Sequence, residues 1–128
     1  MQPDPDTLPL KPARKTGVAH FIAAAGYSIG GARRLLREAA FRQEVLGLTA
    51  LMAVFAMVGA RLPEFLGLLI LSLMVLAVEA VNTAIEELVD RASPEWSEFA
   101  RDTKDMGSFA VMCLLVATGL YAAYVIFC

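Results

Sequence analysis

The sequence lacks the short motifs that mark most nucleotide-binding enzymes. It has no GxxxxGK phosphate loop and no GxGxxG dinucleotide-binding turn. It also has neither the HRD nor the DFG triplet of protein kinases. These absences exclude P-loop NTPases, Rossmann-type dehydrogenases and protein kinases of the usual kind.

Histidine and cysteine are also scarce. The chain has one histidine, His20, and two cysteines, Cys113 and Cys128, and these residues do not have the spacing of a zinc site. Within one helix the two cysteines would lie about 22 Å apart, which is far beyond the reach of a disulfide. We therefore interpret both cysteines as small apolar residues of a helix.

Charge is missing over three long stretches. Residues 45–60 and 106–128 carry no charge, and residues 65–85 carry only Glu79. The chain is 58% hydrophobic, whereas soluble domains are about 45–50% apolar. Because a spanning helix needs roughly 20 mainly apolar residues, the sequence predicts an all-α integral membrane protein. We place its three transmembrane helices at residues 45–62, 65–89 and 106–128.

The basic residues predict how these helices are oriented. Of the 11 Lys and Arg, seven precede the first predicted span, three lie between the second and third, and only Arg61 lies between the first and second. Loops rich in Lys and Arg stay in the cytoplasm. We therefore expect the N-terminus and the loop 90–105 to be cytoplasmic. No apolar signal segment precedes Val18, so no cleaved signal peptide is expected.

The N-terminal part of the chain divides into a tail and a helix. Residues 1–16 are rich in proline and charge and are predicted to be a disordered polar tail, which leaves residues 17–128 as one membrane domain. Residues 17–43 are predicted to form an amphipathic surface helix, because apolar and charged side chains between Arg33 and Glu44 fall on opposite sides at helical spacing. Three glycines near Ser28 predict a bend there.

The loop 90–105 contains a typical helix start. Ser93 has the side chain of a helix cap, Pro94 suits the first helical position, and Glu95 suits the first turn. The sequence therefore predicts a short surface helix that begins at Ser93 and ends before the third span.

The second predicted span carries polar side chains at helical spacing. Glu79, Asn82, Thr83, Glu86 and Asp90 stand at i, i+3, i+4, i+7 and i+11, which places them on one helix face. A charged side chain inside the membrane costs a few kcal/mol and by default marks a functional site. Glu79 and Glu86 lie about 10 Å apart along the axis, which suits a buried reacting group and a charged ligand nearer the cytoplasm. The alternative is that these polar side chains only form hydrogen bonds between helices, as Asn and Thr commonly do in membranes.

Other candidate residues also have a structural alternative. Glu38 has Arg34 and Arg42 four residues away on either side, so it can form ordinary surface ion pairs. Gly107 and Ser108 can simply permit two helices to pack closely. Residue pattern alone therefore stops at a small membrane protein with a buried acidic site near the cytoplasmic leaflet.

Four stretches of the sequence allow a more specific hypothesis. Residues 38–44 (EAAFRQE), 78–91 (beginning VEAVNTAIE) and 104–108 (KDMGS) resemble the bacterial diacylglycerol kinase family, and residues 25–28 (AGYS) resemble its N-terminal element. The stretches occur in the family's order, and the resemblance runs from about residue 18 to residue 128.

This resemblance implies a homotrimer of three-helix subunits in the bacterial inner membrane, with active sites shared between neighbouring subunits on the cytoplasmic side. It implies transfer of the γ-phosphate of ATP to diacylglycerol, with Mg²⁺ as cofactor. Glu79 would be the general base, Asn82 would order the site, and Glu38 and Glu86 would hold Mg²⁺. The residues implied to contact ATP are Tyr27, Glu38, Glu86, Glu95, Lys104 and Asp105. Those implied to border the lipid are Ser28, Ala40, Phe41, Arg42, Gln43, Glu44, Glu79 and Ser108.

The chain departs from the family's pattern in three places. Residues 29–31 are Ile-Gly-Gly, where the family often has an aromatic residue and a lysine, and the chain is one residue shorter before Glu38. In the loop, Trp96-Ser97 and Asp102-Thr103 replace other residues of the family's motifs. The departures concern the nucleotide contacts of the loop and leave the carboxylates in place.

Three alternatives to a diacylglycerol kinase remain at this stage. An undecaprenol kinase would share the fold and the chemistry, although the EAAFRQE and KDMGS stretches resemble the diacylglycerol branch more closely. A small proton-coupled transporter would also use one membrane carboxylate. Two features argue against it, namely the small number of spans, three, and the long basic surface segment. The third alternative is a structural or regulatory membrane peptide without catalysis.

Overall fold

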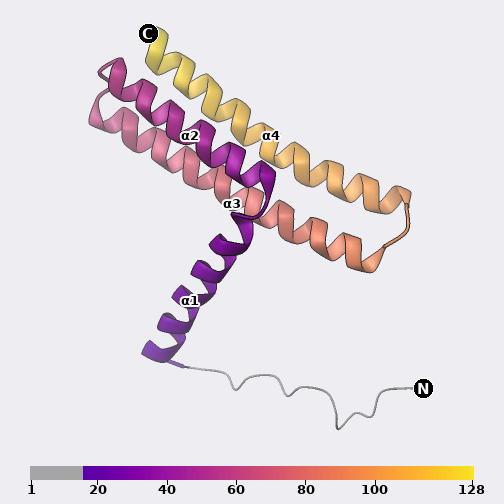
Figure 1. The fold of residues 1–128 in the computed structure, drawn as a ribbon. Helices are drawn as coiled ribbons and strands as arrows, with labels where there is room; N and C mark the ends of the chain where they lie inside the picture. Colours follow the sequence, from indigo (N-terminus) through magenta and orange to yellow (C-terminus); the bar gives the residue numbers. More distant parts are fainter. Residues whose placement is uncertain (1–15) are drawn as a thin grey trace, which may run out of the picture. The chain divides into compact units, whose positions relative to one another are not determined.

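The computed structural model describes residues 16–128 and shows four helices joined by short connections (Figure 1). They are α1 (Val18–Leu35), α2 (Ala39–Met57), α3 (Leu62–Ala92) and α4 (Glu98–Phe127). The chain divides into two compact units, one up to Arg33 and one from Arg34 to Cys128. The tail predicted over residues 1–16 lies almost wholly outside the described residues.

The three helices of the second unit are each long and apolar enough to cross a membrane. They lie side by side (Figure 1), and α3 and α4 form the most extensive pairing. This confirms the predicted fold class, an all-α integral membrane protein with three spans. At 31 residues, α3 is about 46 Å long, whereas the hydrocarbon core of a bilayer is about 30 Å thick. Helix α3 is therefore longer than the hydrocarbon core is thick, and its charged residues from Glu86 onward stand at its C-terminal end.

The connection between α2 and α3 is a tight turn held by local hydrogen bonds. Gly59 ends α2 with φ 74°, a left-handed conformation that favours glycine. Arg61 caps α3, and its backbone N–H donates to Oε2 of Glu64 at 2.6 Å. Pro63 stands in the first turn of α3, where a missing N–H costs nothing.

The best-packed apolar core lies near this turn. Phe55 of α2, Leu68 of α3 and Ala122 of α4 are buried together. The rings of Phe55 and Phe65 meet edge to face with centroids 5.9 Å apart. Tyr121 reaches across from α4, and its hydroxyl donates to the carbonyl of Glu64 at 3.0 Å. The turn end of the three helices is therefore the rigid, dry end.

Gly67 permits the close approach of Tyr121, and this contact gives a stability prediction. A methyl group at Gly67 would lie 2.3 Å from the hydroxyl oxygen of Tyr121 and 2.7 Å from its Cζ. We expect Gly67→Ala to lower the free energy of unfolding by about 1–3 kcal/mol, the usual cost of overpacking. Thermal unfolding in detergent micelles measures this. Gly119→Ala, whose methyl group would meet no atom within 4 Å, is the control that should show no loss.

Helix α1 differs from the prediction for residues 17–43. The predicted bend near Ser28 is wrong, because α1 continues through Gly26, Gly30 and Gly31 to Leu35. The chain instead breaks at residues 36–38, so the segment from Arg33 to Glu44 is not one amphipathic helix. Glu38 stands at this corner with an extended backbone (φ −77°, ψ 132°) at the start of α2. The first spanning helix consequently starts at Ala39, earlier than the predicted 45–62.

The loop between α3 and α4 is shorter than the predicted 90–105. Ser93 does not begin a helix but ends α3, and the next helix begins at Glu98. Ser97 caps this helix, since its hydroxyl accepts a hydrogen bond from the N–H of Ala100 at 3.1 Å. No separate surface helix is present in this part of the described chain, because α4 continues from Glu98 into the third span.

Candidate active site

The buried face of α3 changes from apolar to polar along the helix. Leu68, Ser72, Val75, Glu79 and Asn82 are all buried and follow one face at helical spacing. Glu79 is 5% exposed and Asn82 is 7% exposed. The prediction that these two side chains share a face is confirmed, and this face is covered by protein.

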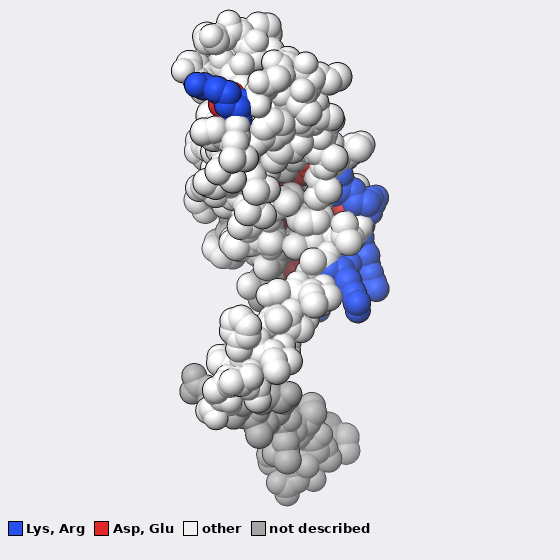
Figure 2. Space-filling model, turned by 90° about the vertical axis from the view of Figure 1, so that its left-hand side faces the viewer, with Lys and Arg blue, Asp and Glu red and all other residues white. Residues whose placement is uncertain are grey.

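An open cavity of about 290 Å³ lies beside the polar part of this face. We call it the acidic cavity. All three spanning helices line it, through Ala40 and Glu44 of α2, through Glu79, Asn82 and Glu86 of α3, and through Ser108, Val111, Met112 and Leu115 of α4. Three of these residues are glutamates and none is basic. The acidic cavity therefore suits a cation or a group that gives up a proton. Figure 2 shows one face of the molecule, on which acidic side chains appear as small areas between uncharged and basic ones.

Two polar oxygens near the acidic cavity have no partner among the described residues. The Nδ2 of Asn82 donates to Oε1 of Glu86 at 3.4 Å, but the Oδ1 of Asn82 is buried and unpaired. The Oε2 of Glu44 is also buried and unpaired. Buried polar atoms are normally hydrogen-bonded in proteins. Unpaired oxygens beside a cavity are therefore available to a ligand or to water.

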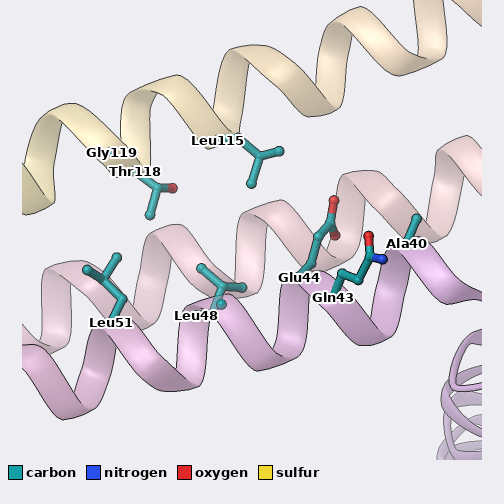
Figure 3. A pocket seen from close by; sticks show the side chains of 9 residues that line it. Ala40, Gln43, Glu44, Leu48, Leu51, Leu115, Thr118 and Gly119 are labelled. Carbon is teal, nitrogen blue, oxygen red and sulfur yellow. The ribbon is translucent and has the colours of Figure 1, made fainter.

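A second, larger cavity continues from the acidic cavity along α2 and α4. It has a volume of about 460 Å³ and shares Ala40, Glu44 and Leu115 with the acidic cavity. We call it the apolar groove. Figure 3 shows Glu44 and Gln43 at one end of it and Leu51 at the other. Its complete lining is Ala40, Gln43, Glu44, Gly47, Leu48, Leu51, Leu115, Thr118 and Gly119. A polar end and an apolar body suit an amphipathic molecule.

Ion pairs tie the charged ends of the helices together. Lys104 of α4 pairs with Asp90 of α3. Arg34 bridges Glu38, at the corner before α2, and Glu87 on α3. The hydrogen bond that Arg34 donates to Glu38 and the charge of Glu87 raise the pKa of Arg34 above its ordinary value, so the guanidinium stays charged. The predicted pairing of Glu38 with Arg34 is confirmed.

Comparison with known proteins assigns the family. Residues 26–126 match the family described as prokaryotic diacylglycerol kinase. The match covers most of the chain and nearly all of the three helices that line the acidic cavity. The chain belongs to the prokaryotic diacylglycerol kinase family.

Several relatives in this family are similar over most of their length. A diacylglycerol kinase from Sinorhizobium sp is 54% identical over 113 residues, which cover 88% of this chain and 82% of the relative. The diacylglycerol kinase of Escherichia coli K12 is 40% identical over 104 residues, which cover 79% and 84%. That of Pseudomonas aeruginosa is 38% identical over 110 residues, which cover 84% and 89%. The predicted resemblance is therefore confirmed, and the transporter and the non-catalytic peptide lose their support.

The structure brings some of the predicted site residues together. Glu79, Asn82, Glu86, Glu44 and Ser108 all line the acidic cavity. Ala40 lines both cavities, and Gln43 lines the apolar groove. These are residues that the family resemblance places at the base, the metal or the lipid.

Other predicted site residues lie outside both cavities. Tyr27 and Ser28 belong to the unit that ends at Arg33, and both are exposed there. Phe41 is buried, and Arg42 donates to the carbonyls of Leu36 and Arg37 at 3.2 and 2.8 Å, so it stabilises the corner before α2. The remaining four are Glu38 and Lys104, which are ion-paired, and Glu95 and Asp105, which are exposed.

The sequence interpretation missed most of the contribution of α4. Val111, Met112 and Leu115 line the acidic cavity but are ordinary apolar residues of a span. Together with Ser108 they stand at i, i+3, i+4 and i+7, the spacing of one helix face. Extending that face from Ser108 would have found them.

Proposed function

We propose that this protein is a lipid kinase that transfers the γ-phosphate of ATP to the hydroxyl of diacylglycerol to give phosphatidic acid. The observation that carries the proposal is the buried carboxylate of Glu79, which lines a cavity between three membrane-spanning helices in a member of this family. A lipid hydroxyl lies just below the headgroups, which suits a carboxylate placed where α3 changes from apolar to polar. The phosphate donor arrives from the water phase beyond Glu86.

In the proposed reaction Glu79 acts as the general base. It accepts the proton of the lipid hydroxyl while a bond forms between the hydroxyl oxygen and the γ-phosphorus. The bond from the γ-phosphorus to the bridging oxygen breaks at the same time, and ADP leaves. Phosphoryl transfer needs positioning and charge stabilisation more than covalent chemistry from the protein. Asn82 meets that need by orienting Glu86, to which it donates a hydrogen bond.

The acidic cavity fits Mg²⁺ by its chemistry. Mg²⁺ prefers oxygen ligands, and in nucleotide sites it keeps several waters and phosphate oxygens besides one or two carboxylates. Of the two proposed ligands, Glu86 lines the cavity, whereas Glu38 lies outside its lining and pairs with Arg34. The buried Oε2 of Glu44, which has no partner among the described residues, can accept a hydrogen bond from one of the waters that Mg²⁺ keeps. No group of three or more acidic, histidine or cysteine side chains converges on one point in the described part of the chain. Bound Mg²⁺ would supply positive charge that neutralises the phosphates of ATP.

The nucleotide is proposed to bind at the charged ends of α3 and α4. Glu86 and Glu38 would hold the metal, and Lys104 would supply positive charge to a phosphate once it leaves Asp90. The further contacts proposed for ATP are Tyr27, Glu95 and Asp105. For the lipid, the proposed contacts are Ser28, Ala40, Phe41, Arg42, Gln43, Glu44, Glu79 and Ser108.

The apolar groove is proposed to hold an acyl chain of the lipid, and this gives a test of substrate fit. A side chain at Gly119 would enter open space in the groove. We expect Gly119→Leu to raise KM for a long-chain diacylglycerol about tenfold, corresponding to about 1.4 kcal/mol of lost binding, and to affect a short-chain diacylglycerol less. Mixed-micelle assays with the two lipids measure this. Ala117→Leu adds bulk to an exposed position of α4 outside the groove and should leave both KM values unchanged.

The proposed setting is the bacterial inner membrane, with the N-terminus and the active site on the cytoplasmic side. The excess of Lys and Arg before α2 and between α3 and α4 supports this orientation. We also propose a homotrimer with shared active sites, on the strength of the family resemblance. Mixing inactive subunits mutated in Glu79 with inactive subunits mutated in Glu38 tests it, since sharing predicts that activity returns in mixed oligomers.

A lipid-substrate assay tests the proposed function as a whole. Purified protein in mixed micelles receives γ-labelled ATP, Mg²⁺ and either diacylglycerol or undecaprenol. Labelled phosphatidic acid is the expected product. If label appears only in undecaprenyl phosphate, the protein is an undecaprenol kinase and the proposed substrate is wrong. Absence of label from both lipids would contradict a lipid kinase.

A further inference from the structure

Helices α3 and α4 come into unusually close contact beside the acidic cavity. A methyl group at Gly107 of α4 would lie 2.1 Å from Oδ1 of Asn82 and 3.2 Å from its Cγ. Separations under about 3 Å between such atoms do not occur without displacement. The carboxamide of Asn82 therefore occupies the space that any other residue at position 107 would fill with its own Cβ.

A flip of the Asn82 carboxamide about χ2 would not relieve the contact. It would place Nδ2 where Oδ1 now lies, and Cγ would stay 3.2 Å from the new methyl group, which is tighter than most such contacts. The side chain is 7% exposed and donates to Glu86 through Nδ2. Its Oδ1 has no hydrogen-bond partner among the described residues, so packing against α4 is what fixes that end of the carboxamide.

The same contact does not occur at most other glycines. Of the glycines in residues 16–128, only Gly67 and Gly107 would bring a new methyl group within 4 Å of another residue, outside the helix's own backbone and the chain neighbours. Gly67 faces Tyr121 in the apolar core, far along α3 from the acidic cavity. Gly107 faces a side chain that lines the acidic cavity. The contact at Gly67 therefore serves packing, and the contact at Gly107 sets the position of the polar side chain of Asn82.

We propose that Gly107 is a positioning residue for the phosphoryl-transfer site. Because position 107 has no side chain, the carboxamide of Asn82 lies against the backbone of α4 and holds the carboxylate of Glu86 toward the acidic cavity. This inference rests on the function proposed above for Asn82 and Glu86. On this inference Gly107 does more than permit close packing of the two helices, because it also sets the position of Asn82.

The first part of the test is a pair of single variants. Gly107→Ala should lower kcat at saturating lipid and ATP by about 10–100-fold, as loss of an orienting contact near a metal site typically does. It should also weaken binding of a fluorescent ATP analogue with Mg²⁺, measured without turnover. Gly67→Ala is the matched control, since it overpacks the same helix pair away from the site. It should lower the unfolding temperature and leave kcat unchanged.

The second part is a double-mutant cycle with Asn82→Ala. In that background a methyl group at position 107 would lie 3.9 Å from the Cβ of residue 82, an ordinary contact. If Gly107 acts through Asn82, adding Gly107→Ala to Asn82→Ala should cause no further loss of kcat or of nucleotide binding. The double variant also keeps the test valid if Gly107→Ala alone folds poorly, because the space is restored.

The outcomes separate this inference from the proposed function. Normal kcat in Gly107→Ala, with Asn82→Ala impaired, would overturn the positioning role alone. Losses that multiply in the double variant would overturn it too, since they would show an effect independent of Asn82. Full activity of Asn82→Ala would overturn the role of Asn82 and, with it, the inference for Gly107.

Discussion

Replacing Glu79 by Gln is expected to lower kcat for lipid phosphorylation by about a thousandfold, within the range that general bases contribute. The substitution keeps the size of the side chain and removes only its ability to accept the proton. Glu79 is 5% exposed and lines the acidic cavity, so bulk water has little access to take over the task. Initial rates with diacylglycerol and MgATP in mixed micelles measure the loss.

Two further measurements decide whether this loss is specific to the base. MgATP binding should be retained in Glu79→Gln, since Glu79 lies deeper in the membrane than the proposed nucleotide contacts. Glu87→Gln is the control on the same helix, because Glu87 is exposed, lies outside the acidic cavity and pairs with Arg34. It should retain near-normal kcat. Full activity of Glu79→Gln would remove the proposed base and with it the mechanism.

The structure shows how far periodicity alone predicts such a site. The spacing of Glu79, Asn82 and Glu86 predicted one face of one helix, because helical spacing is a local property of the chain. The structure confirms that Glu79 and Asn82 are buried, whereas Glu86 is partly exposed. What spacing could not provide is the partner surface, since the lining by Ser108 to Leu115 depends on how α4 crosses α3. Gly107 shows this limit of sequence periodicity most clearly, because its proposed role depends on the absence of a Cβ atom next to Asn82.

Two of the errors in the local prediction have clear physical reasons. Glycine near Ser28 predicted a bend, but glycine within a helix costs only about 1 kcal/mol, and the flanking residues of α1 favour the helix enough to tolerate it. Ser93 and Ser97 are both suitable caps. Helix α3 continues to Ala92, so Ser93 is used at its end, and the hydroxyl of Ser93 bonds the hydroxyl of Ser97 at 2.9 Å. Because Ser93 is used at the C-terminal end of α3, Ser97 is the serine that caps α4.

The two ends of the three-helix unit have different tasks. Near the turn after α2, aromatic rings and the Gly67–Tyr121 contact make a dry core. Toward the ends of α3 and α4 that carry Lys104 and Asp90, the three helices line the acidic cavity, beside which two buried oxygens have no partner among the described residues. Rigid packing at one end supports a polar, open site at the other, because long helices transmit their relative position along their length. Substitutions at the dry end should therefore change stability, and those at the open end should change rate.

Replacing Glu86 by Gln is expected to raise KM for MgATP by about 10–100-fold, the usual range for disturbing a metal site. Gln keeps an oxygen that can accept the hydrogen bond from Asn82, so the change removes charge and leaves the local geometry in place. The loss should shrink as the Mg²⁺ concentration rises, because a weakened site fills at higher metal concentration.

ATP titrations at several fixed Mg²⁺ concentrations measure this dependence, and KM for diacylglycerol should stay within about twofold. Glu87→Gln, one residue further along α3, is the control for removing a carboxylate nearby. The contrast with Glu79→Gln is the stronger argument. Glu79→Gln should lower kcat and keep nucleotide binding, whereas Glu86→Gln should weaken binding in a way that Mg²⁺ relieves. Equal and metal-independent losses in both variants would contradict two carboxylates with separate tasks at two depths of one helix.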